Sequence, residues 1–364
     1  MFRFFASLIF FIVFYLSEAA FAEVFSVEEQ TLIKAFPTSS ADLDLVELHS
    51  RALDEDANAT DVYVAAIVAL RMGANDLAQS HSQLLFETAY SLEDRTRAQL
   101  LGHFVEFYLG PETERGSASV RLIDGMSAYN AAGVQADWLM GTAATLLLDY
   151  AHNHGHPELS RDVVEEMSET LRDRQDVESG IWFVNSNLKA AYTASQHDSD
   201  TVDPFSFLFD GNRLVGHLVS KADDEDVIEL LEMLYLRLHT TFGVIYSRRK
   251  SKKLSGPTES LPFIREFHPS FQIECVSEIN RSKKRFRPRR EFGTGGMMVE
   301  LRVDNQGRVK FVETVDAQPG RLKEKFMHSY LRKWANSMRV SFKSDDPDCR
   351  NGGDLLLPFT LSWD

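Results

Sequence analysis

Few residues in this chain of 364 amino acids are of a type and spacing that could support chemistry. His152, His154 and His156 alternate with other residues, and such imidazoles are candidate ligands for zinc or copper, with His81 or His103 brought close by folding. Neither a cysteine nor a fixed carboxylate pattern accompanies them. We therefore interpret the cluster as a polar loop between helices and predict no metal site and no cofactor.

Motifs for nucleophilic catalysis and for phosphate binding are absent from the sequence. It contains neither a G-x-S-x-G elbow nor a Gly-rich loop that ends in Gly-Lys-Ser or Gly-Lys-Thr. The Gly-rich residues 293–296 precede a predicted strand, so their amides do not gather at a helix N-terminus. We predict that the protein is not an enzyme and assign no catalytic residue. The alternative, an unrecognised site among the helices, would require a cleft with convergent polar groups.

Residues 1–22 have the layout of a secretory signal peptide. Arg3 precedes an apolar run over residues 4–16, and residues 20–22 read A-F-A, an A-x-A cleavage site. The run is shorter than the roughly 20 apolar residues that a membrane-spanning helix needs. We expect a periplasmic protein whose mature chain begins at Glu23. The alternative is an uncleaved leader that anchors the chain in the inner membrane, facing the periplasm.

The charge of the chain is divided unevenly. From Ser247 onward there are 24 Lys and Arg and 15 Asp and Glu, a net charge of +9, whereas the preceding residues carry 15 and 39, a net charge of −24. Opposite signs favour two domains. We therefore expect an acidic helical domain over 23–246, a basic linker over 247–269 that is rich in Lys, Arg, Gly and Pro, and a C-terminal domain over 270–364.

Helical periodicity dominates the acidic half, where apolar residues recur three and four positions apart. Two pairs of helices are predicted, the first around a tight turn at Gly73 and the second around a loop that leads to Pro157, which suits a first helical turn. The predicted helices cover residues 62–70, 77–90, 139–150, 163–171 and 226–246. A spacing of roughly 35 to 40 residues between pairs is typical of tetratricopeptide-like arrays. No repeat consensus recurs, so an irregular helical bundle is the alternative.

The C-terminal domain changes to strand periodicity. Residues 297–303 alternate apolar and charged side chains, and residues 304–307, ending in Gly307, supply a turn before a second strand over 309–315. The apolar phase shifts between Phe311 and Val312, which predicts a bulge or twist there. Helical spacing follows over 322–338.

A last apolar strand covers residues 355–361. Its odd-numbered residues are apolar, and Pro358 lies on the other side. Because proline lacks an N–H for a ladder, the strand should lie at a sheet edge. The fold class predicted for the chain is thus α+β: an N-terminal all-helical repeat or bundle, followed by a small domain with a three-stranded antiparallel sheet and one helix.

The order strand, G-R-V turn, strand, helix with a K-W pair and final strand resembles the TonB C-terminal domain family over residues 295–361. The resemblance rests on V-E-L-R-V-D-N-Q-G-R-V at 299–309, A-Q-P-G at 317–320 and L-R-K-W at 331–334. It implies that the domain pairs with an extended peptide by β-augmentation. Because an edge strand has unpaired backbone groups, we place the peptide-binding residues in the final strand: Leu355, Leu356, Leu357, Phe359 and Leu361. The alternative is a protected edge with no partner, since Pro358 removes a donor.

The predicted export also determines how the two cysteines are interpreted. In an oxidising compartment Cys275 and Cys349 are expected to form a disulfide, the alternative being two unpaired thiols in loops. Export also disfavours nucleic acid as the partner of the basic run at 281–290. Anionic lipid, cell-wall polymer or the acidic domain are the candidates, or the run is merely solvated.

These features together predict a TonB-like binding or scaffold protein of the bacterial envelope, whose partner is an envelope protein or peptide segment. The alternative is a membrane-anchored energy transducer for transport across the outer membrane. The family's transducers carry an uncleaved anchor and a long Pro-rich spacer, and neither pattern is visible here.

Overall fold

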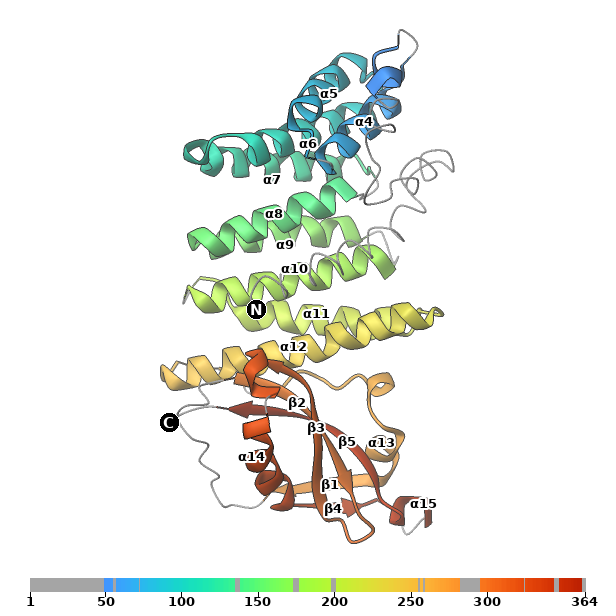
Figure 1. The fold of residues 1–364 in the computed structure, drawn as a ribbon, viewed down its shortest axis with the longest axis vertical. Coiled ribbons are helices and arrows are strands. Elements are labelled where there is room, and N and C mark those ends of the chain that lie inside the picture. The colour runs from blue at the N-terminus through green and yellow to red at the C-terminus, as the bar shows by residue number, and fades with distance from the viewer. Residues whose placement is uncertain are drawn as a thin grey trace. The chain divides into compact units, whose positions relative to one another are not determined.

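The computed structural model describes residues 49–54, 57–71, 73–134, 138–172, 177–197, 201–254, 256–257, 259–281, 295–323, 325–343 and 347–361. The predicted leader, its cleavage site and residues 282–290 of the basic run lie outside these ranges. The chain is α+β and divides into two compact units, one ending at Ser186 and the other beginning at Asn187. Both are drawn in Figure 1.

The first unit is helical throughout its described residues. It contains α4 (Ala59–Arg71), α5 (Asn75–Thr88), α6 (Leu92–Leu109), the 3-10 helix η1 (Glu112–Glu114), α7 (Arg115–Ala131), α8 (Trp138–His154), α9 (Pro157–Arg172) and the start of α10 (Val177–Gln196). Neighbours in the sequence pack on one another, as α4 does on α5 and α8 on α9 (Figure 1). Both predicted helix pairs are confirmed: Gly73 turns the chain with φ +72° and Pro157 opens α9.

The second unit combines helices with two small sheets. It contains the end of α10, α11 (Pro204–Val219), α12 (Glu225–Ser251), η2 (Arg265–Phe267), α13 (Ser270–Cys275), β1 (Val276–Arg281), β2 (Gly295–Val303), β3 (Val309–Gln318), η4 (Gly320–Lys323), α14 (Lys325–Asn336), β4 (Met338–Phe342), α15 (Pro347–Arg350) and β5 (Gly353–Leu361). Helices α11 and α12, expected in the helical domain, therefore belong to the same compact unit as the sheets.

Helix α12 continues through the first residues of the expected linker. The prediction ended it at residue 246, but it extends to Ser251. The guanidinium groups of Arg248 and Arg249 lie over the rings of Tyr192 and Phe205, at 5.7 and 5.9 Å from the ring centroids. These contacts hold the last turn against α10 and α11, and positive charge at a helix C-terminus is stabilising.

The main sheet is antiparallel, with strand order β3-β2-β5. The predicted hairpin is confirmed: Gly307 adopts φ +69°, and an oxygen of the Asp304 carboxylate accepts hydrogen bonds from the amides of Gln306 and Arg308, both at 2.9 Å. The predicted bulge is confirmed as well. Glu300 pairs with Glu313 and Leu301 with Phe311, so the extra residue is Val312.

A second, two-stranded antiparallel sheet joins β1 to β4 and was not predicted. The predicted helix over 322–338 is wrong at both ends: Leu322 lies in η4, and Met338 begins β4. Met338 and Val340 are buried while Arg339 and Ser341 are exposed. This alternation predicts a strand, but the apolar residues up to Met338 also recur at helical spacing. Pairing with β1 stabilises the strand over a longer helix.

The main sheet is covered by helices on both faces. On one face, α14 packs against alternate residues of the three strands, with Leu331 and Leu301 both in its core. On the other face α12 crosses β2, and Gly243 and Gly296 meet there. A Cβ atom at Gly296 would lie 2.2 Å from the carbonyl oxygen of Thr240, so only glycine permits this approach.

Candidate peptide-docking edge

Strand β5 lies at one edge of the main sheet, as Pro358 predicted. It pairs with β2 along its whole length, from Gly353 opposite Val303 to Leu361 opposite Gly295. The five residues predicted to bind peptide all have buried side chains. Phe359 packs edge-on against Trp334 of α14, with ring centroids 4.6 Å apart. These side chains build the core, so any docking at β5 must use its backbone.

The outward side of the β5 backbone can be assigned from one residue. Leu356 directs its N–H and its C=O away from β2, because both bond to the side-chain amide of Gln272. The Leu356 N–H donates to Gln272 Oε1 at 2.7 Å, and Gln272 Nε2 donates to the Leu356 carbonyl at 3.2 Å. Alternate residues of an antiparallel strand point their amides the same way. Asp354, Pro358 and Thr360 therefore face outward too.

This edge offers an interrupted set of donors. Pro358 has no N–H, so it breaks any ladder with a further strand. The carboxylate of Asp354 accepts from Arg302 Nε on β2 at 2.8 Å. The side chain of Thr360 is exposed. Of the outward-facing residues, Leu356 is thus already hydrogen-bonded to Gln272, and Pro358 separates Thr360 from it.

Gln272 comes from α13, which lies beside β5 (Figure 1). The next residue back, Phe271, packs so close to the start of β5 that a Cβ atom at Gly353 would lie 2.3 Å from its ring. Phe271 also joins the core cluster of the sheet and contacts Phe342 of β4 edge-on. The helix is therefore wedged between the beginning of β5 and the second sheet.

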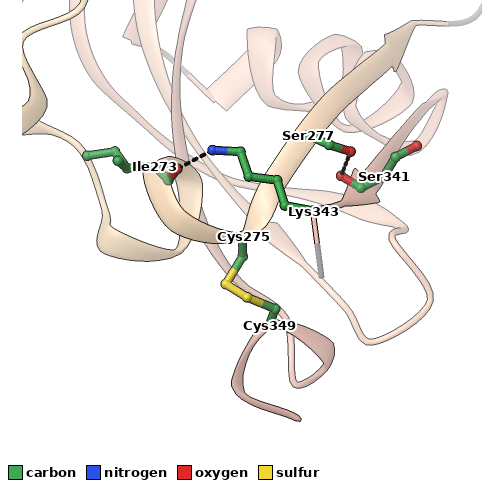
Figure 2. Close-up of a disulfide and its surroundings, with 6 residues drawn as sticks. All are labelled: Ile273, Cys275, Ser277, Ser341, Lys343 and Cys349. Atoms are coloured by element: carbon green, nitrogen blue, oxygen red, sulfur yellow. Dashed lines mark hydrogen bonds between the residues drawn. A yellow bond between two sulfur atoms is a disulfide. The ribbon is translucent and has the colours of Figure 1, made fainter. Parts of the chain in front are cut away.

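The C-terminal end of α13 is fixed covalently. Cys275 and Cys349 form a disulfide with a Cα–Cα distance of 5.1 Å, which confirms the predicted pair and ties α13 to α15, just before β5 (Figure 2). The amide of Lys343 donates to the Cys275 carbonyl at 2.8 Å, and its ammonium group donates to the Ile273 carbonyl. Figure 2 shows these groups converging at the junction of α13 and β1.

The N-terminal side of α13 is held by a buried polar cluster on α12. The Tyr235 hydroxyl lies 2.5 Å from His268 Nε2. Burial raises the pKa of Tyr235 and lowers the pKa of His268, although the nearby Gln272 amide opposes the second shift. Both groups are thus neutral, and a hydrogen bond joins the phenol to the imidazole.

A second imidazole lies one turn along α12. Burial lowers the pKa of His239 to about 3, and the neighbouring His268 adds to this effect, while a hydrogen bond to the Pro262 backbone opposes it. The Asn212 side chain donates to the Pro262 carbonyl at 3.0 Å. The segment before α13 is consequently joined to both α11 and α12 by neutral polar groups.

The remaining candidate residues do not gather into a site. His154 lies against the ring of Tyr150 and 3.8 Å from the carboxylate of Glu112. Within the described ranges, no group of three or more His, Cys, Asp or Glu residues could hold a metal ion. Residues 282–290 of the basic run lie outside the described part of the chain.

Comparison of the chain with protein-family models, with curated proteins and with solved structures finds no match. The resemblance to the TonB C-terminal domain thus rests on the motifs of the sequence. Among the helices that the structure describes, none is both long and apolar enough to span a bilayer.

Proposed function

We propose that this chain is an exported, non-catalytic binding or scaffold protein of the bacterial envelope, similar to the TonB C-terminal domain family, which pairs with an extended segment of a partner protein through β5. The observation that carries the proposal is the position of β5, which is hydrogen-bonded to β2 on one side and has no strand of the described chain on the other. Backbone groups at such an edge can template a further strand.

Two other features support the proposal. The sheet follows the order strand, turn, strand, helix, strand that the family resemblance implies, with β4 as an addition between the helix and the last strand. The disulfide between Cys275 and Cys349 suits an oxidising compartment. Together they favour a sheet whose faces are covered by helices and whose β5 edge pairs with an extended peptide.

A peptide titration tests the docking edge. TonB-box-like peptides added to the isotope-labelled full chain should shift the backbone amide of Thr360 and its neighbours in β5. Thr360→Pro deletes an outward N–H and should weaken binding roughly tenfold, the loss expected for one well-placed hydrogen bond. Thr360→Val is the matched control because it keeps the N–H. Shifts confined to the first unit, with β5 unaffected, would move the docking site to the helices.

The proposed export has its own test. Sequencing the N-terminus of protein taken from the envelope should find Glu23 as the first residue. Finding Met1 on membrane-bound protein instead would favour the anchored energy transducer. Anionic lipid or cell-wall polymer at the basic linker remains a secondary proposal, which binding to vesicles with and without anionic lipid would test.

A further inference from the structure

The contact between α13 and β5 has the form of a strand pairing made by a side chain. The carboxamide oxygen of Gln272 accepts from the Leu356 N–H at 2.7 Å, and the carboxamide nitrogen donates to the Leu356 carbonyl at 3.2 Å. An incoming antiparallel strand would offer the same pair through the N–H and the C=O of one of its residues. Leu356 is also the last outward residue with an N–H before Pro358, so its pair is central to any ladder at this edge.

We propose that α13 is an intramolecular cover of the β5 edge, and that a docking strand must displace the Gln272 carboxamide from Leu356. This inference rests on the proposed docking function and specifies how its edge is controlled. The displaced group is a single side chain, so opening requires neither strand loss nor unfolding of the sheet.

The anchoring of α13 explains why the cover stays closed. Its start follows His268, which is bonded to Tyr235 on α12, and its end is Cys275, which is bonded to Cys349 next to β5. Between these anchors Phe271 fills the space against Gly353. A group held at both ends has little freedom to lose, so the Gln272 contact forms at a low cost in conformational entropy.

The anchors also predict which partner can open the edge. A strand that competes only for the Leu356 pair gains little over Gln272, because it exchanges one pair of hydrogen bonds for another. A strand that continues past Pro358 to Thr360 adds a bond that α13 does not make. The partner is therefore an extended segment of at least five residues, whose carbonyl opposite Pro358 is left facing solvent.

Hydrogen exchange in the full chain tests the cover directly. In Gln272→Leu the amide of Leu356 should exchange roughly three- to tenfold faster, the range expected for one lost hydrogen bond, while Met298 in the central strand stays unchanged. Gln272→Glu keeps the acceptor and loses the donor, so the Leu356 amide should stay protected. Gln306→Leu, in the exposed hairpin turn, is the matched control.

The same variants are then titrated with the TonB-box-like peptide. Gln272→Leu should bind it several-fold more tightly than the parent chain. Cys275→Ser with Cys349→Ser should have an affinity between the two, because Gln272 can still bond to Leu356 but α13 is free at one end. An unchanged Leu356 amide in Gln272→Leu overturns the cover, as does equal peptide affinity in the parent and in Gln272→Leu. If the Leu356 amide exchanges faster in Gln272→Leu but no variant binds the peptide, the cover is supported. The proposed docking function is then overturned.

Discussion

The two units of the molecule are stabilised by contacts of different range along the chain. In the first unit each helix packs mainly on its neighbours in sequence, as in the pairs α4–α5, α6–α7 and α8–α9. In the second unit the ties span long stretches of chain: the disulfide joins residues 74 apart, and the Thr240 hydroxyl donates to Asp316 on β3, 76 residues away. Local packing can be read from periodicity, whereas distant ties depend on the complete fold.

This difference predicts that single changes in the second unit act on all of it, whereas changes in the first unit stay local. Cooperative loss is expected wherever one contact closes a long stretch of chain. Hydrogen exchange resolved by segment separates the two units in each experiment.

Removing the disulfide should have the largest effect. Cys275→Ser with Cys349→Ser releases a loop closed over 74 residues. In the chain-entropy account this lowers the free energy of unfolding by about 4.5 kcal/mol. Denaturant unfolding should show the loss in the second unit while exchange in α4 to α9 stays unchanged. Equal losses in both units would contradict the contrast between them.

A methyl group at the crossing of α12 and β2 should act almost as strongly. In Gly296→Ala the new Cβ atom meets the Thr240 carbonyl oxygen and the Gly243 backbone, so helix and sheet must separate. Overpacking of this kind costs about 3 kcal/mol. Gly320→Ala is the control, since a Cβ atom there has no neighbour within 4 Å. Thermal unfolding of the two variants side by side measures the difference.

The comparison also explains how much of the fold could be predicted. The helix pairs, the hairpin with its bulge, the edge strand and the disulfide each follow from periodicity, turn residues or cysteine number. Strands β1 and β4 did not, because each is short and their pairing joins residues about 60 positions apart, as Ile279 and Val340 show. A two-residue alternation in 338–342 was the available signal.

The covered edge of the candidate site could not be predicted for a related reason. Pro358 correctly predicted that β5 lies at an edge, but Gln272 is a polar residue in a six-residue helix and carries no periodic signal. Its partner is 84 residues away. Likewise Gly243 on α12 was compatible with any helix surface, and only its contact with Gly296 shows that the helix belongs to the sheet.

Acid should weaken the second unit through its buried imidazoles. The pKa of His239 is about 3 in the folded chain, against an unfolded value near 6.5. The unfolded chain therefore binds a proton that the folded chain does not, so stability is complete above pH 6.5 and is lost as pH falls toward 3. For His239 alone the loss between pH 7 and pH 5 is about 2 kcal/mol.

His239→Gln separates this contribution from other titrations. Glutamine stays neutral at every pH and keeps a donor for the Pro262 carbonyl, so the variant should show a smaller decline than the parent chain over the same pH range. His81 of α5, whose pKa burial also lowers, provides the comparison in the first unit. A decline that His239→Gln leaves unchanged would assign the acid response to other groups.

The smallest effects are expected at two helix caps, one in each unit. Ser91 caps α6: its hydroxyl accepts from the Asp94 amide at 3.0 Å and donates to the Asp94 carboxylate at 2.6 Å. Asp224 caps α12 by accepting from the amides of Asp226 and Val227. Losing such a cap costs about 1 kcal/mol.

The two cap variants differ in where the cost appears. Ser91→Ala should speed amide exchange in the first turn of α6 and in the facing α5, with little change in α8 or α9, because packing in this unit is between neighbours. Asp224→Ala should speed exchange in α12 and also in β2 and β5, which α12 covers. The experiment therefore measures whether exchange in β2 and β5 changes, more than how much free energy of unfolding is lost. If Asp224→Ala affects only the first turn of α12, the helix and the sheet unfold separately. Changes in the second unit then stay as local as changes in the first.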